Sequence, residues 1–204
     1  MACPLSSVAQ MPIVSSEPLR RRRYQDVRQG REDGLAKTNK SNNGDPSLMS
    51  RIRIVVVGRT KLPFILEGQQ FYLERLRHYT TVRWSELKSV PAKKKTPGKS
   101  VKDQEGASIL RNIEDREFVM ALDRKGKMYD SRGLASHLEK TFMDHDRLVF
   151  VIGGVLGLSE DVLKRAHAVL SLSRLTFTHE MTRLILPEQL YRAFTILRGE
   201  KYHK

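Results

Sequence analysis

The chain has 204 residues, with 37 lysines and arginines against 23 aspartates and glutamates, and a formal net charge of +14 at pH 7. This length suits one domain of about 150 residues with a tail, and the single cysteine excludes a disulfide framework and a multi-cysteine metal site. No apolar run approaches the roughly 18 residues of a membrane-spanning helix. The basic balance favours nucleic acid over membrane as partner, because no basic amphipathic helix stands out.

Most of the positive charge belongs to the part of the chain that is expected to fold. Residues 1–50 hold eight basic and five acidic side chains, which leaves 29 basic and 18 acidic ones, a net +11, for residues 51–204. Residues 1–50 are rich in Ser, Asn, Gly and Pro and show no hydrophobic period, which predicts a disordered extension. The first sixteen residues lack acidic side chains, which favours an organelle transit peptide for plastid or mitochondrion in a eukaryotic source. A plain extension is the alternative, and another source would place the protein in the cytoplasm.

Residues 51–204 alternate between strand-like and helix-like runs. The expected elements, in chain order, are a strand at 52–57, a helix from Pro63, a strand at 81–87, a lysine-rich loop at 91–102, a helix at 103–115, a strand at 117–122 closed by a turn at 123–126, a helix from Ser131, a strand at 147–152, a short helix capped by Ser159, a strand at 168–171 and a helical stretch to Arg198. This alternation predicts an α/β domain with a mainly parallel sheet flanked by helices.

The most informative strand end is residues 150–157, FVIGGVLG. In open parallel sheets, ligands bind at the carboxyl ends of strands, and glycines there let a ligand approach the backbone closely. The segment is neither a dinucleotide fingerprint nor a P-loop. A tight strand–helix turn explains it equally well.

Two further segments attract attention. Residues 171–179, SLSRLTFTH, follow the last expected strand and either wall a pocket or form a plain loop. The chain ends in Tyr202, His203 and Lys204, although termini are usually frayed. The remaining histidines show no metal-ligand spacing, so no metal site is expected.

In combination, three segments resemble one family. IRIVVVGRTK, FVIGGVLGLS and the closing SLSRLTFTHEMTRLILPEQLYRAFTILRGEKYHK are similar, in order and spacing, to the ribosomal RNA large subunit methyltransferase H family of the SPOUT class. The resemblance covers roughly residues 52–204. It implies a SPOUT-type α/β knot, with a trefoil knot near the C-terminus, a homodimer, and S-adenosyl-L-methionine as cofactor. The implied reaction methylates N3 of a pseudouridine in large-subunit ribosomal RNA of an assembled ribosome.

The resemblance also implies roles for individual residues. The catalytic candidates are His203, which would accept the N3 proton, and Tyr202, which would position the base. Lys204 and Arg192 are the candidates for substrate contact. The implied cofactor residues, with Gly157 added from geometry, are Leu122, Gly153, Gly157, Leu172, Ser173, Arg174, Leu175, Thr176 and Phe177.

Two residues depart from the family pattern. Lys204 stands where many members carry arginine, so a bidentate phosphate contact is in doubt. Pro187 falls inside an expected helix, which therefore either begins near Leu186 or kinks. A SPOUT enzyme acting on transfer RNA and a noncatalytic basic RNA-binding protein are the alternative functions.

Overall fold

The computed structural model describes residues 51–91 and 97–202. Predictions for residues 1–50, for the middle of the lysine-rich loop, and for His203 and Lys204 lie outside these described residues. The elements are β1 (Arg51–Val57), α2 (Pro63–Leu76), β2 (Thr81–Leu87), α3 (Gly98–Arg111), β3 (Phe118–Lys127), α4 (Ser131–Asp144), β4 (Arg147–Ile152), α5 (Glu160–Arg165), β5 (Ala168–Leu170) and α6 (His179–Leu197).

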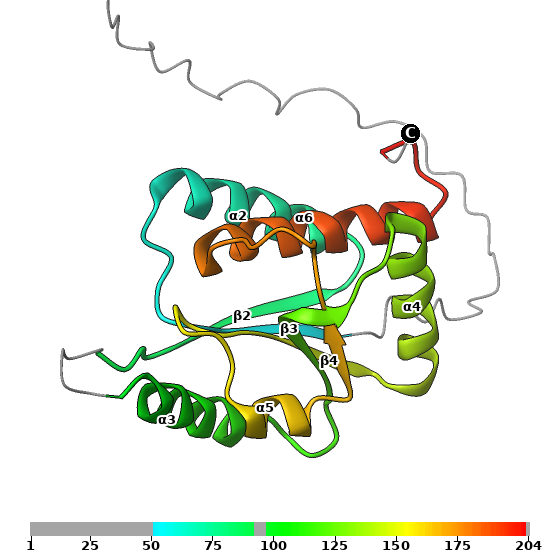
Figure 1. Cartoon of the computed structure of the whole chain (residues 1–204). Helices are drawn as coiled ribbons and strands as arrows, with labels where there is room; N and C mark the ends of the chain where they lie inside the picture. Colours follow the sequence, from blue (N-terminus) through cyan, green and yellow to red (C-terminus); the bar gives the residue numbers. More distant parts are fainter. Residues whose placement is uncertain (1–50, 92–96, 203–204) are drawn as a thin grey trace, which may run out of the picture. The chain divides into compact units, whose positions relative to one another are not determined.

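The five strands form one sheet in the order β2-β1-β4-β3-β5, and every pair is parallel. Helices α2, α4 and α6 cover one face, and α3 and α5 cover the other (Figure 1). Alternate residues of β1 serve the two faces: Ile54 packs with the first group of helices, and Val55 with the second. This alternation is what a strand buried on both sides requires, and it confirms the predicted parallel α/β sheet.

Two boundary predictions in the middle of the chain are wrong. The helix predicted at 103–115 begins at Gly98, directly after Pro97, and ends at Arg111, so the lysine-rich loop is shorter than expected. The turn predicted at 123–126 is part of β3, because Lys127 and Leu122 both align with Leu170 of β5. Residues 123–126 therefore form an irregular insertion in the strand, which we call the β3 bulge.

Pro187 lies inside α6, eight residues after its first residue, so the prediction of a helix beginning near Leu186 is wrong. Proline removes one backbone donor from a helix and crowds the preceding turn, at a cost of about 3 kcal/mol. Leu186, Pro187 and Leu190 are all buried. Tertiary packing of this face against the core sustains the helix through the proline.

Arg183 is a charged residue within the core. Its side chain is fully buried, and its Nη2 donates a 2.6 Å hydrogen bond to the carbonyl of Val57, the last residue of β1. Its Nη1 lies 3.8 Å from the Glu180 carboxylate, which accepts hydrogen bonds from the backbone N–H of Lys61. Burial lowers the pKa of Arg183, but a guanidinium stays protonated in proteins. Arg183 thus joins the start of α6 to the end of β1.

We expect Arg183→Met to destabilise the fold by about 3 kcal/mol, because the Val57 carbonyl and the Glu180 carboxylate lose a buried partner. Arg192→Met is the matched control: it lies on the same helix and removes a partly exposed ion pair with Glu188, which is worth about 1 kcal/mol or less. Urea unfolding of both variants measures the difference. Equal losses would contradict a special role for Arg183.

Candidate functional site

A cavity of about 550 Å³ opens at the carboxyl edge of the sheet. The end of β3, the loop after β4 and the loop after β5 line it, because parallel strands end at the same edge. The cavity unites all but one of the predicted cofactor residues, namely Leu122, Gly153, Gly157, Leu172, Ser173, Leu175, Thr176 and Phe177. Arg174 is exposed and does not line it.

The loop after β4 is a tight turn that forms one wall of the cavity. Gly157 donates its N–H to the Gly154 carbonyl at 3.0 Å and has a φ of 81°. A Cβ on Gly153 would lie 2.7 Å from the carbonyl carbon of Gly157. The segment is therefore both a tight turn and a wall of the cavity. Only glycine lets the chain turn back this closely.

The loop after β5 is held by its own hydrogen bonds. Ser171 donates its N–H to the backbone carbonyl of Lys127 at 2.9 Å and its hydroxyl to the Ser173 carbonyl at 3.0 Å. The Ser173 hydroxyl accepts from the Leu175 N–H at 3.0 Å. Thr178 then caps α6 by accepting from the Met181 N–H. These contacts fix the backbone of the loop as one wall of the cavity.

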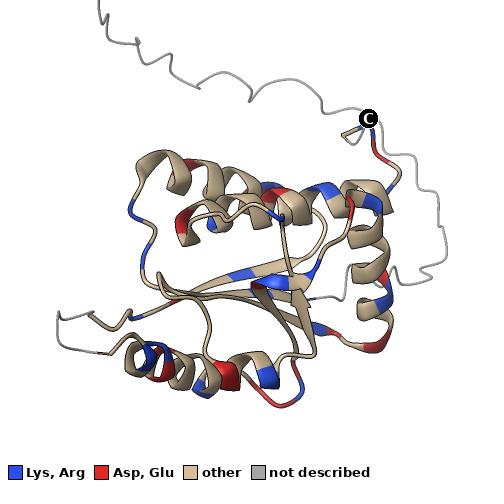
Figure 2. Cartoon of the chain, in the orientation of Figure 1, with Lys and Arg blue, Asp and Glu red and all other residues tan. Residues whose placement is uncertain are grey.

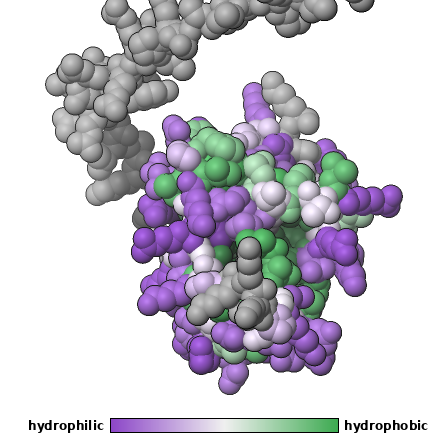
Figure 3. All heavy atoms as spheres, turned by 60° about the vertical axis from the view of Figure 1, so that its left-hand side comes forward, coloured by the Kyte–Doolittle hydropathy of each residue, from purple (hydrophilic) through white to green (hydrophobic). Residues whose placement is uncertain are grey.

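Apolar side chains stand exposed around the cavity. Val155 is 81% exposed and Leu175 is 73% exposed, with Leu156 and Phe177 also on the surface. Figure 3 shows hydrophobic residues gathered in the middle of this face and hydrophilic ones around them. Exposed apolar groups beside a hollow mark a ligand or partner site.

Sequence reasoning missed the polar residues that line the same cavity. They are Lys102, Asp123, Arg124, Lys125, Glu160 and Thr182; His179, which also lines the cavity, falls in the 171–179 segment that the sequence offers as a pocket wall or a plain loop. Three of them belong to the β3 bulge, which the sequence predicts as a simple turn. Gly126 is the one available signal, although Asp-Arg-Lys-Gly is equally typical of an ordinary turn.

Tyr202 and Arg192 contact each other, and neither of them lines the cavity. The Arg192 guanidinium lies 4.9 Å from the centre of the Tyr202 ring, whose hydroxyl lies 3.3 Å from Glu188 Oε1 and 3.5 Å from the Tyr72 hydroxyl. Burial, and then Tyr72 and Glu188, raise the pKa of Tyr202, against a smaller opposing effect of Arg192. Arg192 follows the cavity-lining His179 by thirteen residues of helix, a rise of about 20 Å.

Neither a metal cluster nor a membrane span is evident in the described part of the chain. No group of three or more His, Cys, Asp or Glu side chains in residues 51–91 and 97–202 is arranged to hold a metal ion. Within the same ranges, every helix is too short or too polar to cross a bilayer.

Comparison with known proteins gives consistent results. The profile of a family described as "Predicted SPOUT methyltransferase" matches residues 50–203. Ribosomal RNA large subunit methyltransferase H of Desulfotalea psychrophila is 47% identical over 152 residues, covering 74% of this chain and 97% of that protein. The enzyme of the same name from Listeria monocytogenes is 45% identical over 157 residues, covering 75% and 99%. A solved probable methyltransferase from Bordetella pertussis has a TM-score of 0.47 at 13% identity, over 73% of this chain and 97% of that one.

His179, at the cavity wall, should make the fold less stable in acid. Burial, and then the charge of Arg183, hold its pKa below 6.5. The unfolded chain therefore binds more protons once the pH falls below about 7, and stability is lost down to the folded-state pKa. We expect His179→Gln to lose less unfolding free energy than the wild type between about pH 7.5 and about pH 5.5, as urea titrations would measure. Identical losses would contradict this expectation.

Proposed function

We propose, since the chain belongs to the SPOUT methyltransferases and among them to the ribosomal RNA large subunit methyltransferase H family, that it methylates N3 of a pseudouridine in large-subunit ribosomal RNA with S-adenosyl-L-methionine as donor. One observation carries the proposal. Eight residues that the family resemblance assigns to the cofactor, or that geometry adds, converge from three separate segments on one cavity.

The residues of the cavity fit S-adenosylmethionine. The volume of the cavity, about 550 Å³, is in the usual range for small-molecule sites. Leu122, Leu172 and Leu175 would contact the adenine, and a Cβ at Gly153 would crowd the turn that walls the site. S-adenosylmethionine supplies an electrophilic methyl group when bound. The protein's remaining task is to align the target nitrogen and remove its proton.

The proton at N3 needs an acceptor, and His203 is the candidate. A histidine with an ordinary pKa near 6.5 is neutral at pH 7 and can accept a proton within about 3 Å, or through one water. Tyr202 immediately precedes it. Because the Tyr202 ring packs against Tyr191 with their centres 4.7 Å apart, we assign Tyr202 the task of holding the end of the chain as well as that of meeting the base.

The separation of Tyr202 from its own cavity supports a homodimer. With about 20 Å of helix between the cavity and the Tyr202 contacts, a second copy would bring its chain end to the cavity of the first. Exposed apolar side chains on α2, Phe64 and Phe71, offer surface for such an interface. We also propose that the chain from β5 into α6 forms the trefoil knot, which the membership in the SPOUT family supports.

We expect the full chain to bind S-adenosylmethionine with micromolar affinity in isothermal titration calorimetry. Leu175→Lys should weaken binding at least tenfold, or about 1.4 kcal/mol, because it replaces the apolar contact with the adenine by a hydrated cation. Met143→Lys, an equally exposed apolar site on α4, is the matched control. Absence of binding by the wild type would overturn the methyltransferase proposal.

His203→Ala should abolish methyl transfer and leave the affinity for S-adenosylmethionine unchanged, because it removes the proton acceptor only. The measurement is mass spectrometry of large-subunit ribosomal RNA after incubation of unmodified ribosomes with each protein. A methylated pseudouridine formed by the wild type alone supports the proposal. Unchanged turnover would remove His203 from the mechanism, and methylation of transfer RNA instead would establish the alternative substrate.

A further inference from the structure

The β3 bulge is a built feature of the cavity mouth. Residues 123–126 lie between Leu122 and Lys127, which both align with Leu170 of β5. The Asp123 carboxylate accepts the N–H of Lys125 at 2.9 Å and so fixes the turn of the bulge. A Cβ on Gly126 would lie 2.6 Å from the backbone of Val169 and Leu170, so this position requires glycine. The bulge projects two exposed cations, Arg124 and Lys125, at the cavity.

These two cations have no counterion in the described structure. Within residues 51–91 and 97–202, the side chains of Arg124 and Lys125 form neither a hydrogen bond nor an ion pair. The carboxylates at the cavity are Asp123, which is committed to the Lys125 backbone, and Glu160. Figure 2 shows Lys and Arg dominating the end of β3. The rim of the cavity therefore presents free positive charge.

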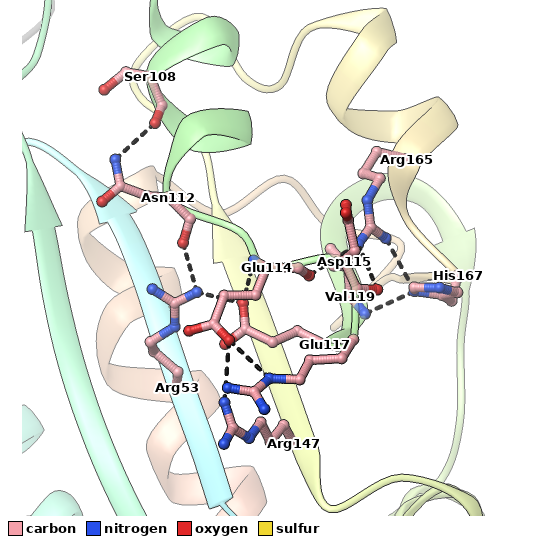
Figure 4. A network of polar contacts seen from close by, with 11 residues as sticks. Arg53, Ser108, Asn112, Glu114, Asp115, Glu117, Val119, Arg147, Arg165 and His167 are labelled. Carbon is pink, nitrogen blue, oxygen red and sulfur yellow. Dashed lines mark hydrogen bonds and ion pairs between the residues drawn. The ribbon is translucent and has the colours of Figure 1, made fainter.

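Three arginines near the opposite edge of the sheet, in contrast, have ion-pair or hydrogen-bond partners. Arg53 pairs with Glu117, and Arg147 with Glu114 at 3.1 Å. Arg165 donates to the backbone carbonyls of Glu114 and Asp115. Figure 4 shows these arginines pointing toward carboxylates and carbonyls. Arg53, Arg147 and Arg165 are thus partnered near the strand starts, whereas the side chains of Arg124 and Lys125 face the cavity without a partner among the described residues.

We propose that the β3 bulge is a phosphate-binding element, in which Arg124 and Lys125 hold the RNA backbone beside the nucleotide presented to the cavity. The inference rests on the proposed function for the identity of the polyanion, and adds where on the surface it is held. Phosphates contacted in this way give affinity without sequence preference and release counterions. The bulge places both charges at the mouth of the cavity that would hold the methyl donor.

The test compares two double variants of the full chain, Arg124→Gln/Lys125→Gln and the control Arg132→Gln/Lys140→Gln. The control removes the same charge from exposed positions on α4 that do not line the cavity. The probe is a fluorescein-labelled single-stranded RNA of about 12 nucleotides, and fluorescence anisotropy gives Kd at several salt concentrations. We expect the bulge variant to bind roughly tenfold more weakly at about 0.1 M salt, with a salt slope shallower by about 1.4. The control should retain the wild-type slope.

Calorimetry with S-adenosylmethionine distinguishes RNA phosphate from the donor's carboxylate as the ligand of Arg124 and Lys125. Unchanged cofactor affinity in the bulge variant supports RNA phosphate as the ligand, whereas lost cofactor affinity with unchanged RNA binding assigns the cations to the donor's carboxylate and overturns the proposal. A salt slope equal to that of the wild type also overturns it. Because the anisotropy assay needs no methyl transfer, an inactive wild type that still binds RNA through the bulge would fail the proposed function alone.

Discussion

The hydrogen bond from Arg183 to the carbonyl of Val57 fixes where α6 begins relative to the sheet. Strand β1 ends at Val57. The carbonyl of Val57 is a backbone acceptor that needs a partner, and the buried guanidinium of Arg183 supplies it. The residue before α6, Thr178, ends the loop that walls the cavity. A charge inside the core therefore determines the position of a loop at the surface.

The parallel sheet determines the rest of the site. Because all five strands run in the same direction, the β3 bulge and the loops after β4 and β5 meet at one edge, although they are well separated in sequence. The same geometry gathers the strand beginnings at the other edge, where Glu114 and Glu117 neutralise the arginines. Arg53 and Arg147 are therefore held in ion pairs at one edge, whereas Arg124 and Lys125 stay available to a partner at the other.

The sequence predicts the positions of the strands well, most clearly where they are β-branched or aliphatic runs, as in β1 and β4. The strand at 147–152 agrees in both bounds with β4. The start of α3 could not be predicted, because Gly98 is a poor helix former and only the fold buries Val101 in the first turn of the helix. The β3 bulge could not be predicted for a similar reason, because a turn-like sequence gives no sign that Lys127 returns to pair with β5. Arg183 looks from its sequence like any solvated arginine, and only the fold buries it.

Helix α6 connects the two halves of the proposed active site and keeps them apart. At its start, His179 and Thr182 line the cavity; near its end, Glu188, Tyr191 and Arg192 receive the ring or hydroxyl of Tyr202. Burial of Leu186 and Pro187 against the core leaves this helix little freedom to bend. Tyr202 does not line the cavity of its own chain while it stays in these contacts. If the proposed function holds, a catalytic group beyond Tyr202 would act on a second copy, and methyl transfer would depend on assembly.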